Sequence, residues 1–225
     1  MVHYMFVLHK RGKGTFLMRD FALNRLQEIY DGFSADYDRG RALFDNRAQL
    51  EMLAKEIPPG ADVLDAGCGS GNPVLCFFAE QGFSLTGTDI SPAMLRLAAQ
   101  QVPTARLVEA DSAALSFDEG SFDLITSFYS LFHLEIEKQK QAFEHFFRML
   151  RSDGLAYFTL ASEEYTGSPE FCGTKSFAGV ELPYSHIQPD AYRGLLEEIG
   201  FRVEGMEHRF VGGETMLWVL VCKPA

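Results

Sequence analysis

One short stretch constrains the fold of this chain more than any other: VLDAGCGSGNP, residues 63–73. An apolar run that ends in Asp65 leads into glycines at alternate positions, Gly67, Gly69 and Gly71. Glycine lets the backbone turn sharply and lie close to a ligand, and a helix N-terminus beside such a loop favours anions. A lone glycine motif is a weak signal. The stretch therefore predicts a strand-to-helix turn that is structural, binds a dinucleotide phosphate, or binds another nucleotide-like ligand.

Strand and helix patterns alternate after this loop. Short apolar runs bounded by turn residues predict strands at 61–66, 83–89, 105–111, 122–128 and 155–161. Helical spacing predicts helices at 72–81, 91–101 and 131–150. The second of these helices begins with Ser91 as N-cap and Pro92 at the first helical position. The alternation predicts an α/β fold, a mostly parallel sheet with helices on both faces.

The C-terminal part departs from this alternation. A helix predicted at 189–199 is followed by two strand-like runs, FRVEGMEHRF and TMLWVLVC, with only residues 211–214 between them. A parallel crossover needs a dozen or more residues, so these runs predict an antiparallel hairpin. Residues 162–188 mix Gly, Ser, Pro and aromatic residues without a sustained period, so no regular element is predicted there.

Composition narrows the class of protein and of partner. A chain of 225 residues with 47% hydrophobic and 23% charged content is typical of a soluble globular protein. The net charge of −11 argues against nucleic acid as the main partner, since that binding relies on clustered Lys and Arg. The sequence shows no apolar run long enough to span a membrane. Four cysteines without a CxxC pair favour reduced thiols in a cytoplasmic protein and no metal site.

Two carboxylates follow the next two predicted strands. Asp89 ends the second strand and Asp111 the third. In an open α/β sheet, ligands bind outside the carboxyl ends of the strands. Asp89 could accept hydrogen bonds from both hydroxyls of a ribose, and Asp111 could lie near an adenine amino group. Each could equally be an exposed loop residue or a cap, but their agreement with the glycine loop favours a nucleoside-binding site.

Five segments, in this order and spacing, resemble the successive motifs of class I S-adenosylmethionine-dependent methyltransferases: VLDAGCGSG, GTDIS, EADSAAL, FDLITSFYSLFHL and LRSDGLAYFTL. The resemblance covers residues 21–225 and includes the terminal hairpin. It implies a Rossmann-like, doubly wound sheet of seven strands in the order 3-2-1-4-5-7-6, with strand 7 antiparallel. It also implies S-adenosylmethionine as cofactor, with S-adenosylhomocysteine as product.

The resemblance also implies a domain organisation. The segment IYDGFSADYD, residues 29–38, is similar to the N-terminal lid of that family. We therefore expect a weakly ordered extension over 1–20, a helical lid over 21–60 and the methyltransferase domain over 61–225. Residues 162–188 stand where the family keeps insertions on the substrate side, and their acidic and aromatic side chains equally suit a solvated loop.

The family motifs imply a set of cofactor contacts, carried over position by position. The glycine loop would surround the methionine moiety, Asp89 the ribose, and Asp111 the adenine edge. The full implied set is Tyr30, Tyr37, Asp65, Gly67, Cys68, Gly69, Asp89, Ile90, Met94, Asp111, Ser112, Ser127 and Phe128. For Tyr30 and Tyr37, core packing on an amphipathic helix is the alternative interpretation.

Candidates for catalysis and for acceptor binding follow the fourth strand and the insertion. Methyl transfer from a sulfonium needs alignment, exclusion of water and, for some acceptors, a base. His133 is the first candidate base and His186 the second, with a packing or helix-end role as the alternative. Tyr129, Phe132 and Tyr184 are candidates for the wall of the acceptor pocket. An acidic chain with one short insertion favours a small-molecule acceptor.

Two other functions compete with this interpretation. A nicotinamide-dependent oxidoreductase would also use a glycine loop and Asp89, but its motif is GxGxxG and the spacing here is GxGxG. A non-catalytic protein that binds S-adenosylmethionine would keep the same binding residues. Nothing in the binding motifs separates this second alternative from an enzyme.

Overall fold

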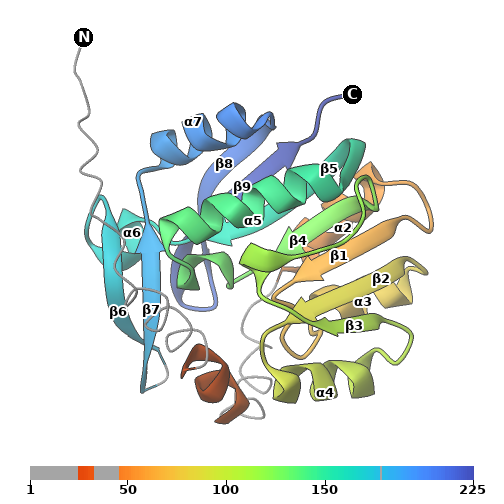
Figure 1. Cartoon of the computed structure of the whole chain (residues 1–225), viewed down its shortest axis with the longest axis horizontal. Coiled ribbons are helices and arrows are strands. Elements are labelled where there is room, and N and C mark those ends of the chain that lie inside the picture. Colours follow the sequence, from red (N-terminus) through yellow and green to blue (C-terminus); the bar gives the residue numbers. More distant parts are fainter. Residues whose placement is uncertain (1–24, 33–45, 178) are drawn as a thin grey trace.

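The computed structural model describes residues 25–32, 46–177 and 179–225. Its main sheet has seven strands in the order β3-β2-β1-β4-β5-β9-β8 (Figure 1). The strands are β1 (Asp62–Ala66), β2 (Ser84–Asp89), β3 (Arg106–Glu109), β4 (Phe122–Ser127), β5 (Leu150–Leu160), β8 (Arg202–Val211) and β9 (Glu214–Cys222). Strands β1 to β5 pair in parallel, and β9 is antiparallel to both β5 and β8. The predicted fold class, strand order and terminal hairpin are confirmed.

Helices cover both faces of this sheet. The long helices are α2 (Arg47–Glu56), α3 (Val74–Glu80), α4 (Pro92–Gln101), α5 (Ile136–Met149) and α7 (Pro189–Ile199). One core packs α2 and α3 against the sheet, together with Leu26 of a further helix over 25–32. The other core packs α5 and α7 against the opposite face, and Figure 1 shows this pair in front of the sheet. With helices on both faces, the central strands β1 and β4 are buried along almost their whole length.

Local sequence signals fix several element ends. Ser91 caps α4, since its Oγ accepts from the Met94 backbone N–H at 3.1 Å, and Pro92 occupies the first turn. Helix α7 ends at Gly200, which adopts a φ of 116° in the left-handed region. The predicted start of α4 and the predicted end of α7 are both confirmed.

The predicted helix over 131–150 is wrong at both ends. A 3-10 turn, η3 (Leu131–His133), comes first, and α5 begins only at Ile136. Leu134 between them is extended, with a φ of −88° and a ψ of 144°, so helical periodicity alone concealed the break. At the other end, Leu150 already belongs to β5, which pairs with β4 through an irregular register.

Residues 162–188 contain regular structure that the sequence did not predict. A short helix, α6 (Glu163–Thr166), leads into an antiparallel hairpin of β6 (Phe171–Phe177) and β7 (Val180–His186). The hairpin forms a separate two-stranded sheet beside the main one (Figure 1). Every residue of β6 is exposed or half-buried, so its side chains lack the alternation of a strand with one buried face.

The core between α5 and β5 gives a test of the fold. Phe143 is fully buried and stacks on Phe158, with ring centroids 5.1 Å apart. We expect Phe143→Ala to lower the free energy of unfolding by about 3–5 kcal/mol, since it removes a large core side chain and leaves a cavity. Urea denaturation measures this. The matched control is Phe210→Ala, at a side chain 74% exposed, which should change it by less than about 0.5 kcal/mol.

Candidate functional site

A cavity lies at the carboxyl ends of β1, β2, β3 and β4. Loops after these strands line most of it, and the helix over 25–32 supplies Leu26 and Tyr30. The lining residues are Leu26, Tyr30, Gly67, Gly69, Asp89, Ile90, Met94, Ala110, Asp111, Ser112, Tyr129, Ser130, His133 and Leu134. Its position is the one at which open α/β sheets bind ligands.

The glycine loop brings the ends of β1, β2 and β4 close together. The backbone N–H groups of Gly67 and Cys68 both donate to the carbonyl of Thr88, at 2.7 and 2.8 Å. Gly67 has a φ of 78°, and a Cβ built on it would lie 2.2 Å from the Ser130 Oγ. Any side chain at this position would therefore clash with the loop after β4. Glycine is required here for the shape of the cavity.

Asp89 is held in place by the two loops beside it. Its Oδ2 accepts from the Gly69 backbone N–H and its Oδ1 from that of Ser91, both at 2.8 Å. Enclosure by the protein raises the pKa of Asp89 to about 6, although these two hydrogen bonds act in the opposite direction. Asp89 also lines the cavity, so a carboxylate that is fixed by backbone hydrogen bonds faces it.

Asp111 forms the adjoining part of the wall. It precedes η2 (Ser112–Ala114) and caps this turn, because its Oδ1 accepts from the Ala113 backbone N–H at 2.9 Å. Lys138 of α5 lies 3.5 Å from its other carboxylate oxygen. The interpretation as a cap and the interpretation as a ligand contact are compatible, since Asp111 caps the turn and also lines the cavity.

His133 lies on the opposite side and is bonded through both ring nitrogens. Nδ1 lies 2.7 Å from the carbonyl oxygen of Pro183, and Nε2 lies 2.8 Å from the Tyr30 hydroxyl. A carbonyl can only accept, so the proton of the neutral ring is on Nδ1, and Nε2 accepts from Tyr30. Burial lowers the pKa of His133 to about 4, so the ring is neutral at ordinary pH.

Besides the bond from Tyr30 to His133, the helix over 25–32 makes a second polar contact, to the start of α4. The Asp31 carboxylate accepts from the Ser91 Oγ at 2.5 Å and from the Ala93 backbone N–H at 3.1 Å. Asp31 thus binds the N-terminus of α4, where a negative charge is favourable. With Tyr30 bonded to His133 on the other side, the helix bridges the two walls of the cavity.

The structure brings together most of the residues predicted to form the site. Ten of them line the cavity: Tyr30, Gly67, Gly69, Asp89, Ile90, Met94, Asp111, Ser112, Tyr129 and His133. Their individual roles stay predictions. Tyr37 lies outside the described residues. The others do not line the cavity: Asp65, Cys68, Ser127, Phe128, Phe132, Tyr184 and His186.

Four of these residues hold the sheet beneath the cavity. The Thr126 hydroxyl donates to the Asp65 carboxylate at 2.8 Å, and the Ser127 hydroxyl donates to the Ala66 carbonyl at 2.7 Å. Both bonds join β4 to β1. Cys68 is buried, with its thiol close enough to Gly87 that a Cβ there would lie 2.9 Å away. Phe128 belongs to an aromatic group with Tyr157 and Trp218.

Phe132 and Tyr184 support His133 from behind. Their rings stack with centroids 4.9 Å apart and an interplanar angle of 5°. Each also contacts the His133 ring in a T-shaped arrangement, at 4.7 Å for Phe132 and 5.0 Å for Tyr184. Both side chains are 2% exposed. They orient the imidazole from the packed side, away from the cavity lining.

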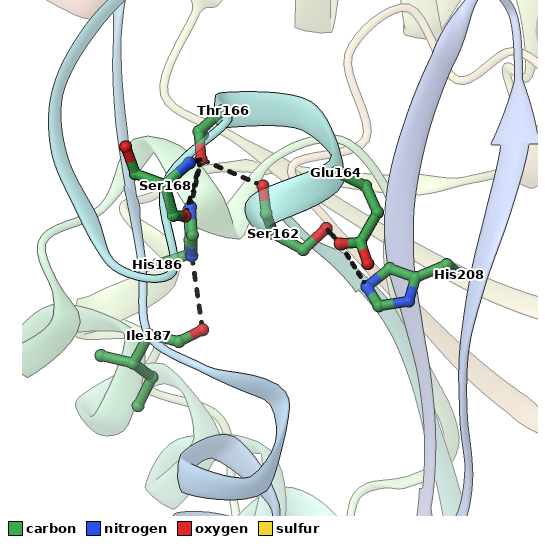
Figure 2. A network of polar contacts seen from close by, with 7 residues as sticks. All are labelled: Ser162, Glu164, Thr166, Ser168, His186, Ile187 and His208. Atoms are coloured by element: carbon green, nitrogen blue, oxygen red, sulfur yellow. Dashed lines mark hydrogen bonds and ion pairs between the residues drawn. The ribbon is translucent and has the colours of Figure 1, made fainter.

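His186 belongs to a polar network that anchors the hairpin (Figure 2). Its Nε2 lies 2.7 Å from the Thr166 Oγ1, whose hydroxyl is also 3.1 Å from the Ser162 carbonyl. The network continues where the Ser162 hydroxyl donates to Glu164, which in turn pairs with His208 of β8 at 2.8 Å. Burial lowers the pKa of His186. Its surroundings favour a structural role.

Four lining residues escaped prediction from the sequence. They are Leu26, Ala110, Ser130 and Leu134. Ser130 had a signal in principle, because it is a polar residue shortly after the fourth strand, and Asp89 and Asp111 also lie near the ends of their strands. The other three are apolar, and nothing in their spacing distinguishes them from core residues.

The comparisons with known proteins decide the family. The methyltransferase domain family matches residues 63–154. An uncharacterized methyltransferase of Synechocystis sp. is 30% identical over 172 residues, which is 75% of this chain and 78% of that protein.

The chain belongs to the class I S-adenosylmethionine-dependent methyltransferases. Malonyl-[acyl-carrier protein] O-methyltransferase of Enterobacter lignolyticus is 36% identical over 120 residues, 52% of this chain and 47% of that protein. Matches to three other relatives span only 23%, 56% and 52% of their length. The assignment decides for S-adenosylmethionine and against a nicotinamide dinucleotide.

A solved structure matches this methyltransferase over nearly its whole length. The 1,6-didemethyltoxoflavin-N1-methyltransferase of Burkholderia thailandensis has a TM-score of 0.69 and 20% identity, and the match covers 97% of this chain and 94% of that one. At this identity the likeness concerns the fold. Within the described part of this methyltransferase, no helix is long and apolar enough to cross a membrane.

The raised pKa of Asp89 gives a test of the site. If Asp89 binds the ribose, affinity for S-adenosylhomocysteine should fall as the pH drops through about 6, because a protonated carboxyl loses an acceptor. Dissociation constants from calorimetry should rise about tenfold between pH 7.5 and pH 5. Asp89→Asn should bind more weakly at pH 7.5 and lose this pH dependence, whereas the exposed control Asp118→Asn should keep it. A flat wild-type profile would contradict the assignment.

Proposed function

We propose that this methyltransferase binds S-adenosylmethionine in the cavity and transfers its methyl group to a small-molecule acceptor. One observation carries the proposal: a single cavity joins the glycine loop, Asp89 and Asp111 on one wall to Tyr30 and His133 on the other. The first wall suits a nucleoside and an amino acid, and the second suits an acceptor with a proton to lose.

The residues present fit the cofactor. The fixed carboxylate of Asp89 would accept the ribose hydroxyls, beside the apolar side chains of Ile90 and Met94. Asp111, with Ser112, would meet the edge of the adenine ring. The backbone of Gly67 and Gly69 would lie along the methionine moiety, where the left-handed turns, with φ values of 78° and 54°, leave room for it.

The other wall would serve the acceptor. When bound, S-adenosylmethionine supplies an activated methyl group on a sulfonium. The protein must then align the acceptor, exclude water and take a proton. Tyr129 adds an aromatic surface beside His133. Tyr129 has a φ of 58°, which is unusual for a residue with a side chain. Its position beside the cavity therefore involves backbone strain.

A small-molecule acceptor is supported by charge and by relatives. The chain carries a net charge of −11, which disfavours nucleic acid. The Burkholderia enzyme described above was crystallised with 1,6-didemethyltoxoflavin and S-adenosylhomocysteine bound.

The test pairs binding with turnover. Calorimetry with S-adenosylhomocysteine measures the cofactor site, and formation of this product from S-adenosylmethionine with a panel of small acceptors measures transfer. Binding with no product from any acceptor would favour the non-catalytic alternative. No binding of S-adenosylhomocysteine at pH 7.5 would contradict the proposed function altogether.

His133 gives a sharper prediction. If its imidazole takes part in proton removal, His133→Ala should lower turnover on the order of 10²- to 10⁴-fold. The dissociation constant of S-adenosylhomocysteine should change less than about threefold, because the cofactor contacts lie on the other wall. The control His145→Ala, on α5 and outside the cavity lining, should change neither. Equal losses of turnover and affinity would contradict a catalytic role.

A further inference from the structure

The hydrogen bonds of His133 limit what can reach its basic nitrogen. Nδ1 is held by the Pro183 carbonyl, and Nε2 is bonded to the Tyr30 hydroxyl at 2.8 Å. An acceptor in the cavity therefore meets an imidazole whose lone pair is already in use. Tyr30 and His133 both line the cavity, so the tyrosine oxygen is the atom through which the acceptor can reach the base.

We propose that the acceptor is a neutral molecule with an aromatic hydroxyl or ring N–H, and that Tyr30 takes its proton while passing its own to His133. This deepens the function proposed above and rests on it. Tyr30, which the family resemblance implied as a cofactor contact from the N-terminal lid, would then be a catalytic residue. His133 would act behind it as the final proton acceptor.

The step balances with the groups named. The O–H or N–H bond of the acceptor breaks and its proton goes to the Tyr30 Oη. The Tyr30 proton moves along the existing hydrogen bond to the His133 Nε2. The electron pair of the acceptor forms the bond to the methyl carbon as the methyl–sulfur bond breaks, with its electrons on sulfur. The products are the methylated acceptor, S-adenosylhomocysteine and a protonated His133.

The chemistry of the pair selects the class of acceptor. Carboxylic acids are ionised at neutral pH and many thiols reach their reactive form readily, so neither needs a relay of this kind. A phenol or a ring N–H is neutral at that pH and gains nucleophilicity as its proton leaves. The aromatic lining supplied by Tyr30 and Tyr129 suits a planar ring.

The surrounding structure keeps the relay in one tautomer. Gln139 of α5 donates to the carbonyls of Leu134 and Ser185, at 2.8 and 2.9 Å, and so fixes η3 against β7. Its own Oε1 accepts from Tyr192 at 2.6 Å. This frame places the Pro183 carbonyl on Nδ1, which leaves Nε2 as the basic atom.

The first test observes the relay without turnover. Nitrogen-15 spectra of the histidine side chains should show His133 neutral between pH 6 and 8, with its proton on Nδ1. Among the described residues, the titratable groups that touch its ring are Tyr30 and Tyr184. Tyr30→Phe should shift the Nε2 resonance and leave the proton on Nδ1. The control Tyr157→Phe should shift neither, and a proton found on Nε2 in the wild type would overturn the proposal.

The second test uses a matched set of acceptors on one ring: 2-naphthol, 2-naphthoate and 2-naphthalenethiol, with benzimidazole for the ring N–H. These four lead a wider library of phenols, nitrogen heterocycles, carboxylic acids and thiols. Methylation confined to the hydroxyl and ring N–H members supports the proposal. Faster methylation of the carboxylates or thiols overturns it, and so does the absence of any product from the hydroxyl and ring N–H members.

The pH dependence of turnover with an acceptor of this class shows whether Tyr30 transfers a proton or only covers the cofactor. Tyr30→Phe should reduce turnover at pH 7 by on the order of 10²-fold. Its rate should then rise about tenfold per pH unit toward the pKa of the acceptor itself, because only the ionised acceptor reacts without the relay. The wild type and Tyr157→Phe should stay flat over the same range. An unchanged profile in Tyr30→Phe overturns the proposal.

Affinity for S-adenosylhomocysteine keeps this proposal distinct from the function on which it rests. Wild type and Tyr30→Phe should bind it within about threefold of each other, since the ring of residue 30 remains. A loss of affinity that matches the loss of turnover would leave Tyr30 as a cover alone. Failure of the wild type to bind would instead contradict the cofactor assignment.

Discussion

The parallel pairing of β1 with both β2 and β4 is the constraint on which the rest of the structure depends. Asp65 pairs with Gly87 on one side and with Thr126 on the other, so three chain segments end at the same edge of the sheet. The backbone N–H groups of Gly67 and Cys68 then donate to the Thr88 carbonyl and close the loops over that edge. The positions of the glycine loop and of Asp89 at the cavity follow from this register.

The close approach of Gly67 to Ser130 extends the constraint across the cavity. A Cβ on Gly67 would lie 2.2 Å from the Ser130 Oγ, so the loop after β4 lies directly against the loop after β1. The chain then turns through η3 and presents His133. The hairpin β6–β7 and the helix over 25–32 meet this imidazole from two further directions, through Pro183 and Tyr30. The part of the cavity around His133 thus joins segments that are far apart in the sequence.

Prediction from the sequence succeeded where the signal is local. Ser91 and Pro92 mark the start of α4, and Asp89 ends β2 as its position after an apolar run indicates. It failed where contacts with other segments determine the local backbone conformation. At the break, the carbonyl of Leu134 accepts from Gln139, which also donates to Ser185 of β7, and helical spacing carries no trace of this arrangement. The half-exposed strand β6 likewise lacks the period by which strands are found.

By itself, the sequence indicated one part of the cavity: the glycine loop and the carboxylates Asp89 and Asp111 at the ends of their strands, whereas the order of the strands was implied by the family resemblance. These features depend on backbone conformation and on residues a few positions apart, which a linear pattern records. Only the tertiary structure decided the state of His133. Its tautomer and its bond to Tyr30 depend on a carbonyl 50 positions away and a hydroxyl 103 positions away. Contacts over such separations arise from packing, and no local spacing encodes them.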